Sequence, residues 1–206
     1  LGDVYKRQKL CGKQTEKGLI AMAKFGANYP CFKGKEKEKG VIIGKLVSAN
    51  LTVNMASGEL YADDALAEQI SEFSSGTIAM ETDDMDAAVA AEIYGCTVSE
   101  DNTVTYKAGD NAPTGSLGYY KVLMRKGVKA YEGYYYPKVR AALGNDNAQT
   151  KSGSITFQTT STTFTVFADD NTDWRVTKLF DTDAEARKWI DEKLAIQSVQ
   201  EPPAGS

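Results

Sequence analysis

The sequence predicts a mainly β (α+β) fold: a β-sandwich or barrel with one flanking helix, a long hairpin and a C-terminal helix. Three observations predict this class. Apolar residues alternate with period two over several long segments, and only two segments show helical spacing. The predicted strands also follow one another in runs, without the regular strand–helix alternation that is typical of parallel α/β folds.

The first 21 residues are expected to lie outside the native protein. A reverse translation of LGDVYKRQ, residues 1–8, contains the transposon end used to prepare sequencing libraries. The codons of residues 16–18 can hold a ribosome-binding sequence, and three codons separate them from Met22. A genuine polar arm that becomes ordered on binding is the alternative. We therefore expect translation to begin at Met22, with one domain over 22–195 and a disordered tail over 196–206.

The charge balance argues against nucleic-acid binding. The sequence has 24 Lys and Arg and 28 Asp and Glu, and residues 1–21 hold five and two of them. The remainder therefore carries 19 basic and 26 acidic residues, a net charge of −7. Affinity for phosphates needs clustered Lys and Arg. The spacing of Cys31 and Cys96 does not match a metal site, and both are expected to be buried free thiols. No apolar run approaches the roughly 20 residues that a membrane helix needs.

The clearest alternation runs over residues 41–55, where odd positions are mostly apolar and even positions from Ser48 are polar. Fifteen residues at roughly 3.3 Å each would span about 50 Å, so this strand is expected to bend or to project past the core. Ser57-Gly58 is expected to end it. Residues 57–75 are expected to form a long excursion rather than a core element, and residues 76–81 to return as a strand.

A short helix is predicted next. Asp83 is a suitable N-cap, and acidic residues in a first turn suit the helix dipole. Met85, Val89 and Ile93 share one face at four-residue spacing, and Gly95 suits the position after the helix.

Residues 117–140 predict a hairpin with its turn at residues 125–127. Its tyrosines fall on both strand faces, whereas a half-buried sheet needs aromatics on one face only. Either both faces pack inside this chain, or one face packs on another subunit, because tyrosine is enriched in interfaces. The tyrosines are Tyr119, Tyr120, Tyr131, Tyr134, Tyr135 and Tyr136.

Two further strands and a helix complete the predicted elements. In residues 154–167 the apolar phase switches midway, which predicts a bulge or kink near 159–163. Residues 174–180 form another predicted strand. The final helix begins at a capping box, Thr182 with Glu185, and carries a narrow apolar stripe. That stripe contains Ala186, Trp189, Ile190 and Leu194.

No pattern of catalytic or cofactor-binding residues stands out, so neither an enzyme nor a cofactor is expected. The sequence contains no His, which removes Ser-His and Cys-His nucleophile pairs. Residues 40–45 (GVIIGK) are one residue short of a phosphate loop. Asp169, Asn171 and Asp173 have calcium-loop spacing without its Gly or its final Glu, so an acidic turn is expected. Pairs such as Asp63-Asp64 are expected to be solvated rather than hydrolytic.

Taken together, the sequence resembles the major tail (tail tube) proteins of long-tailed, non-contractile bacteriophages. The similar blocks are ordered along almost all of 22–193. They are MAKFGANYP, GKLVSANLTVN, GELYADDALAE, FSSGTI, GYYKVLMRKGVKAY, YYPKV, SITFQT, the ADDN-x-x-W element and FDTDAEARKWID. Cys31 and Cys96 are departures from the family pattern.

This resemblance implies a virion protein, made in the cytoplasm of the bacterial host, that forms hexameric rings stacked into a hollow tube. The genome would pass through without specific binding, and the partners would be the chain itself, the tape measure protein and the tail terminator. In this picture the 57–75 excursion reaches the adjacent ring, with Tyr61, Asp63 and Asp64 as inter-ring contacts. The candidate subunit interface contains Tyr119, Tyr120, Tyr134, Tyr135 and Tyr136.

Two alternatives remain open at this point. The chain could be the tube protein of a related injection machine. It could also be a monomeric β-sandwich binding module for a carbohydrate or a peptide, since such a module would explain the aromatic residues equally well.

Overall fold

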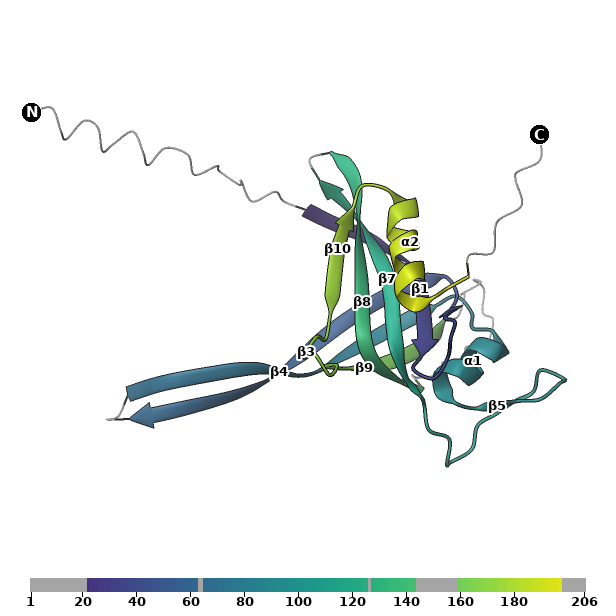
Figure 1. Cartoon of the computed structure of the whole chain (residues 1–206), viewed down its shortest axis with the longest axis horizontal. Helices are drawn as coiled ribbons and strands as arrows, with labels where there is room; N and C mark the ends of the chain where they lie inside the picture. The colour runs from purple at the N-terminus through teal and green to yellow at the C-terminus, as the bar shows by residue number, and fades with distance from the viewer. Residues whose placement is uncertain (1–21, 63–64, 126, 144–158, 198–206) are drawn as a thin grey trace, which may run out of the picture.

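One large antiparallel sheet forms most of the molecule, which confirms the predicted mainly β class (Figure 1). The computed structural model describes residues 22–62, 65–125, 127–143 and 159–197. The sheet order is β2-β1-β7-β8-β9-β4-β3, and β10 pairs with a second stretch of β8. The elements are β1 (Met22–Gly34), β2 (Val41–Ile42), β3 (Leu46–Ala62), β4 (Ala65–Thr82), α1 (Ala87–Tyr94), β5 (Thr97–Val98), β6 (Val104–Thr105), β7 (Thr114–Arg125), β8 (Val128–Leu143), β9 (Thr160–Phe167), β10 (Val176–Phe180) and α2 (Asp183–Leu194).

The sheet curls around a single main core. Phe32 on β1 and Phe164 on β9 have two strands between them, which would put them about 14 Å apart in a flat sheet. Their ring centroids lie 6.0 Å apart, and neither side chain is exposed. Apolar side chains from β1, β3, β4, β7, β8 and β9 all contribute to this core. The architecture is therefore a strongly curled, open barrel-like sheet, with β2 and β3 as its end strands among the residues described.

Strand β8 joins the two halves of the sheet. Its residues 131–135 pair with β10, and its residues 138–143 pair with β9. Figure 1 shows β7, β8 and β10 running upright, while β3, β4 and β9 cross below them. Because one 16-residue strand serves both halves, the curl is built into a continuous backbone.

The β7–β8 hairpin forms as predicted, with Arg125 paired to Val128 and a positive φ of 79° at Gly127. The structure resolves the ambiguity of its tyrosines, because both faces are covered within this chain. Tyr119, Tyr134 and Tyr136 belong to the main core. Tyr120 lies in a second core under α2, and Tyr131 and Tyr135 pack against that core.

This burial bears on the predicted subunit interface. Tyr119, Tyr120, Tyr134 and Tyr136 have exposed fractions of 1, 2, 6 and 0% within one copy, because α2 and the curled sheet cover them. Tyr135 is half-buried. The interface role of all five tyrosines stays a prediction.

Helix α2 covers the outer face of β7 and β8, as its apolar stripe predicted. Thr182 accepts a hydrogen bond from the Glu185 backbone N–H at 3.3 Å, and Ala186, Ile190 and Leu194 are completely buried. The helix can approach closely because glycine faces it: a Cβ on Gly118 would lie 3.0 Å from a Leu194 methyl. Ile196, which the sequence analysis placed in the terminal tail, packs against the same core, and residues 198–206 lie outside the described residues.

The N-cap of helix α1 is Asp86, three residues after Asp83, the predicted N-cap. Asp86 occupies the N-cap without a side-chain cap bond, whereas Asp83 accepts hydrogen bonds from the backbone N–H groups of Lys45 and Asp84. Asp83 therefore ties the start of β3 to the end of β4 instead of capping the helix. The predicted C-terminus is confirmed, because Gly95 is left-handed with φ 72° and donates to Ala91 O.

The predicted strand over 41–55 is two strands, β2 and β3, separated by residues 43–45. Ile43, Ala49 and Leu51 face the main core, but Val47 is 54% exposed because a register shift between Leu46 and Ser48 turns it outward. The prediction that Ser57-Gly58 ends the strand is wrong. Pairing with β4 continues to Ala62, so the local turn signal is overridden by a cross-strand ladder.

The described part of β9 agrees with its predicted phase, and β10 begins two residues later than the strand predicted over 174–180. Thr162, Phe164 and Val166 point into the core, and β9 pairs regularly with β4 from Thr160 onward. No register shift interrupts the described part of β9, so the expected bulge does not lie in residues 160–163, and residues 144–158 lie outside the described residues. Cys31 and Cys96 are buried free thiols, as predicted.

Candidate assembly surface

The most distinctive feature of the molecule is a β-hairpin that leaves the sheet. Strand β9 pairs with β4 only over residues 76–82, and beyond that point β3 and β4 pair only with each other, up to Ala62 and Ala65. We call residues 55–73 the arm. Figure 1 shows it extending well away from the rest of the molecule, which we call the body. About eight residues per strand at roughly 3.3 Å each give a reach of about 25 Å.

Among the arm residues whose side chains the structure describes, both faces carry exposed positions, and only Phe73 at the base is half-buried. Cross-strand pairing places Ala56, Gly58, Ile70 and Glu72 on one face, and Met55 with Phe73 on the other. Met55 is 54% exposed and Ile70 is 59% exposed, which is unusual for large apolar side chains on regular strands. An isolated two-stranded ribbon is marginally stable in water. These exposed apolar residues therefore mark a surface suited to contact with another molecule.

An aromatic stack fixes the base of the arm. The rings of Phe73 and Trp174 lie 4.4 Å apart and nearly parallel, at 5°. The Arg175 guanidinium lies 4.6 Å from the Trp174 ring centroid. Because Trp174 belongs to the segment between β9 and β10, the stack couples the direction of the arm to the body.

The turn before Trp174 is the acidic turn predicted from Asp169, Asn171 and Asp173. Asp169 Oδ1 accepts hydrogen bonds from the backbone N–H groups of Asn171 at 2.9 Å and Asp173 at 2.8 Å. This carboxylate therefore holds the turn that presents Trp174. Within the described ranges, no group of three or more His, Cys, Asp or Glu residues is arranged to hold a metal ion.

Of the three predicted inter-ring residues, the structure describes only Tyr61, which lies near the far end of the described part of the arm. Tyr61 pairs with Leu66 next to the end of β3. Asp63 and Asp64 lie outside the described residues. The inter-ring role of these residues stays a prediction. Residues 57–75 were expected to form an excursion, and their described part is a two-stranded ribbon.

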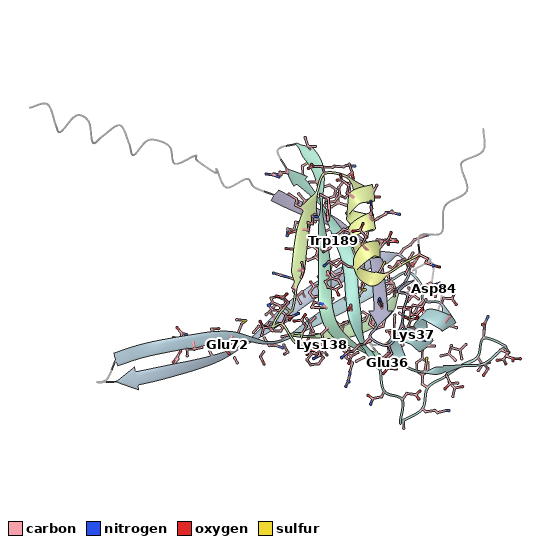
Figure 2. All side chains as sticks on the ribbon, viewed as in Figure 1. Glu36, Lys37, Glu72, Asp84, Lys138 and Trp189 are labelled. Carbon is pink, nitrogen blue, oxygen red and sulfur yellow. The ribbon has the colours of Figure 1, made fainter. Side chains whose placement is uncertain are left out.

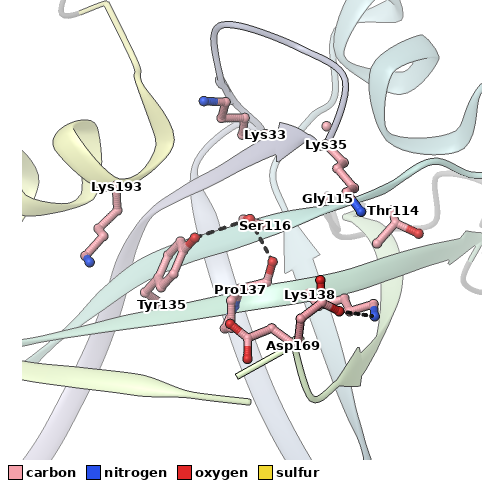
Figure 3. A pocket seen from close by; sticks show the side chains of 12 residues that line it. Lys33, Lys35, Thr114, Gly115, Ser116, Tyr135, Pro137, Lys138, Asp169 and Lys193 are labelled. Atoms are coloured by element: carbon pink, nitrogen blue, oxygen red, sulfur yellow. Dashed lines mark hydrogen bonds and ion pairs between the residues drawn. The ribbon is translucent and has the colours of Figure 1, made fainter. Parts of the chain in front are cut away.

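A second feature, the lysine pocket, lies on the body where β1, β7, β8 and α2 meet (Figure 3). It has a volume of about 280 Å³, and its basic residues are Lys33, Lys35, Lys138 and Lys193. Its floor is ordered by hydrogen bonds, since Tyr135 donates to Ser116 Oγ at 3.4 Å and Ser116 donates to Pro137 O at 2.9 Å. Asp169 and Asp170 also line it, with Asp170 3.9 Å from the Lys138 ammonium.

This pocket was not predicted from the sequence, although the uneven distribution of charge along the chain separates the arm from the residues around the pocket. Residues 46–106 contain no Lys or Arg and twelve Asp or Glu, so every basic residue beyond Met22 lies in 22–45 or after 106. The segment that forms the arm is therefore acidic, while the strands and helix around the pocket carry the basic residues. The meeting of four lysines at one site depends on tertiary structure and could not be read from spacing.

No protein-family model matches this chain, and no curated protein matches it. Neither helix in the described part of the chain is long and apolar enough to cross a membrane.

Proposed function

We propose that this chain is a structural assembly protein, the tail tube subunit of a long-tailed, non-contractile bacteriophage. The arm is the observation that carries the proposal. A ribbon with a reach of about 25 Å leaves Met55 and Ile70 exposed in a single copy, whereas it can bury these apolar side chains against a neighbour. The ordered sequence blocks that resemble the tail tube family run through this same segment.

The free edges of the sheet support self-association. Strand β3 has no partner on its outer edge among the described residues, although it is 17 residues long. Long exposed edges invite pairing with another chain unless something covers them. In a closed ring, each subunit would cover an edge of the next through two different patches, and the arm would reach the adjacent ring.

The charge balance supports a tube that conducts DNA. With 19 basic and 26 acidic residues beyond residue 21, the subunit carries an excess of negative charge that disfavours adhesion of phosphates to the wall. On this proposal the genome passes through without specific binding. The tape measure protein and the tail terminator are the further partners, and the protein resides in the virion.

Negative-stain microscopy and sedimentation of residues 22–206 test the proposal directly. We expect rings or hollow tubes that grow with concentration. A chain that stays monomeric at every concentration and binds a carbohydrate or a peptide would replace the proposal with the binding-module alternative.

The structure also defines the end points of a deletion that removes most of the arm. Ala56 and Glu72 are directly paired, so residues 57–71 can be replaced by an Asn-Gly turn that keeps Phe73 on Trp174. We expect this variant to fold with a nearly unchanged melting temperature and to form no tubes. If it still polymerises normally, the role assigned to the arm is wrong.

A further inference from the structure

We propose that the lysine pocket is the docking site for the acidic arm of a second copy of this chain. This inference rests on the proposed function and goes beyond it, because it names the receiving surface on the body. The charge, the position and the chemistry of the two surfaces each support it.

The pocket carries an excess of positive charge, because four lysines line it against two aspartates, Asp169 and Asp170. Its lysines come from β1, the loop after it, β8 and α2. Of the four ion pairs found in the described residues, only the one between Lys138 and Asp170 involves the pocket. Its charged atoms are 3.9 Å apart and both side chains are exposed to solvent, so this ion pair is weak. Like charges brought together repel one another within a Debye length. An incoming carboxylate would relieve this repulsion and would be attracted in turn.

The arm offers the complementary chemistry. Glu72 and Ile70 lie on one face of β4, and both are exposed. The arm contains no cation, because residues 46–106 have neither Lys nor Arg. Besides its lysines, the pocket is lined by the apolar surface of Pro137 and the half-buried ring of Tyr135. A strand that carries Glu next to Ile therefore matches both the charge and the apolar part of the pocket.

The arm of the same copy does not reach this pocket. In Figure 2, Glu72 lies out along the arm, whereas Lys138 lies on the body where the strands cross. The base stack of Phe73 on Trp174 holds the arm in that outward direction. An arm that occupies the pocket therefore comes from another copy, and a contact between two different patches is the kind that propagates an assembly.

Charge reversal tests the docking. We expect Lys33→Glu/Lys35→Glu to raise the concentration needed for assembly at least about tenfold, the effect of losing a single favourable charge pair. The control Lys107→Glu/Lys129→Glu makes the same change in net charge at exposed positions that do not line the pocket, and it should leave assembly within about twofold of the wild type. Sedimentation and microscopy measure assembly, and circular dichroism confirms folding of each variant. Lys33→Gln/Lys35→Gln replaces the reversal if the latter fails to fold.

A charge swap identifies the occupant. Glu59→Lys/Glu72→Lys changes the two arm acids whose side chains the structure describes, and it should block assembly when the pocket is wild type. Combined with Lys33→Glu/Lys35→Glu, it should restore assembly at least in part. If each reversal blocks assembly and the combination does not restore it, the arm is not the occupant and the inference is overturned.

The outcomes separate the two proposals. Normal assembly of the pocket variant overturns the docking site and leaves the proposed function standing. A wild-type chain that never assembles overturns both.

Discussion

The body and the arm are built from the same kind of strand, yet they differ in what covers them. In the β7–β8 hairpin, tyrosines on both faces are buried, one set in the main core and the other under α2. In the arm, β3 and β4 also pair along their described length, with register shifts at Asn54/Met55 and Leu60/Tyr61, but Met55 and Ile70 remain exposed. Period-two patterning thus specifies a strand, whereas the cover of each face depends on the rest of the fold or on a partner.

Alkaline pH should have the largest effect, and it should act on the body. Burial raises the pKa of Tyr120 from 10.0 to about 12, and burial likewise raises the pKa of Tyr119, Tyr134 and Tyr136. Because the folded state keeps these protons while the unfolded state loses them near pH 10, stability is fully present below pH 10 and falls as pH rises above it. We expect cooperative unfolding of the body between about pH 10 and 12, measured by circular dichroism together with tyrosinate absorbance. Ionisation of most tyrosines near pH 10 with an unchanged fold would contradict the burial of both hairpin faces.

A matched pair of substitutions on β4 sharpens the comparison between body and arm. Ile78 is completely buried in the main core, and Ile70, eight residues earlier on the same strand, is 59% exposed in the arm. We expect Ile78→Ala to lower the free energy of unfolding by about 2–5 kcal/mol, because it leaves a cavity. Ile70→Ala should change it by less than about 0.5 kcal/mol and should weaken assembly instead. Urea unfolding of both variants measures the difference, and equal losses of stability would show that the arm packs on the body of its own copy.

Much of the body could be predicted from the sequence because its signals are local. The Thr182 cap, the Ala186–Ile190–Leu194 stripe and the glycine after α1 each depend on neighbours within a few residues. The start of α1 was missed because Asp83 bonds to Lys45, which is far away in the sequence. Val47 was misplaced because the register shift at the start of β3 leaves no mark on the alternation.

The candidate site was predicted only in part, for the same physical reason. Residues 57–75 were recognised as leaving the core from their acidic, patchily apolar composition. That they form a ribbon depends on pairing between Gly58 and Ile70, which overrides the turn preference of Ser57-Gly58. The lysine pocket draws its cations from strands and a helix that meet only in the folded chain.

The smallest expected effect concerns the junction between arm and body, where Phe73 stacks on Trp174. Trp174 is half-buried, and aromatic pairs contribute about 0.5–1.5 kcal/mol beyond the area they bury. We expect Trp174→Ala to cost about 1–2 kcal/mol of stability and to speed amide hydrogen exchange at residues 53–55 and 73–75, while the core strands keep their protection. Trp174→Phe keeps a stacking ring and should retain most of the protection. The chain has only two tryptophans, so in both variants the fluorescence of Trp189 reports on α2 and the body alone. If exchange at the arm base stays slow in Trp174→Ala, pairing between β3 and β4 suffices to aim the arm, and the stack does not couple it to the body.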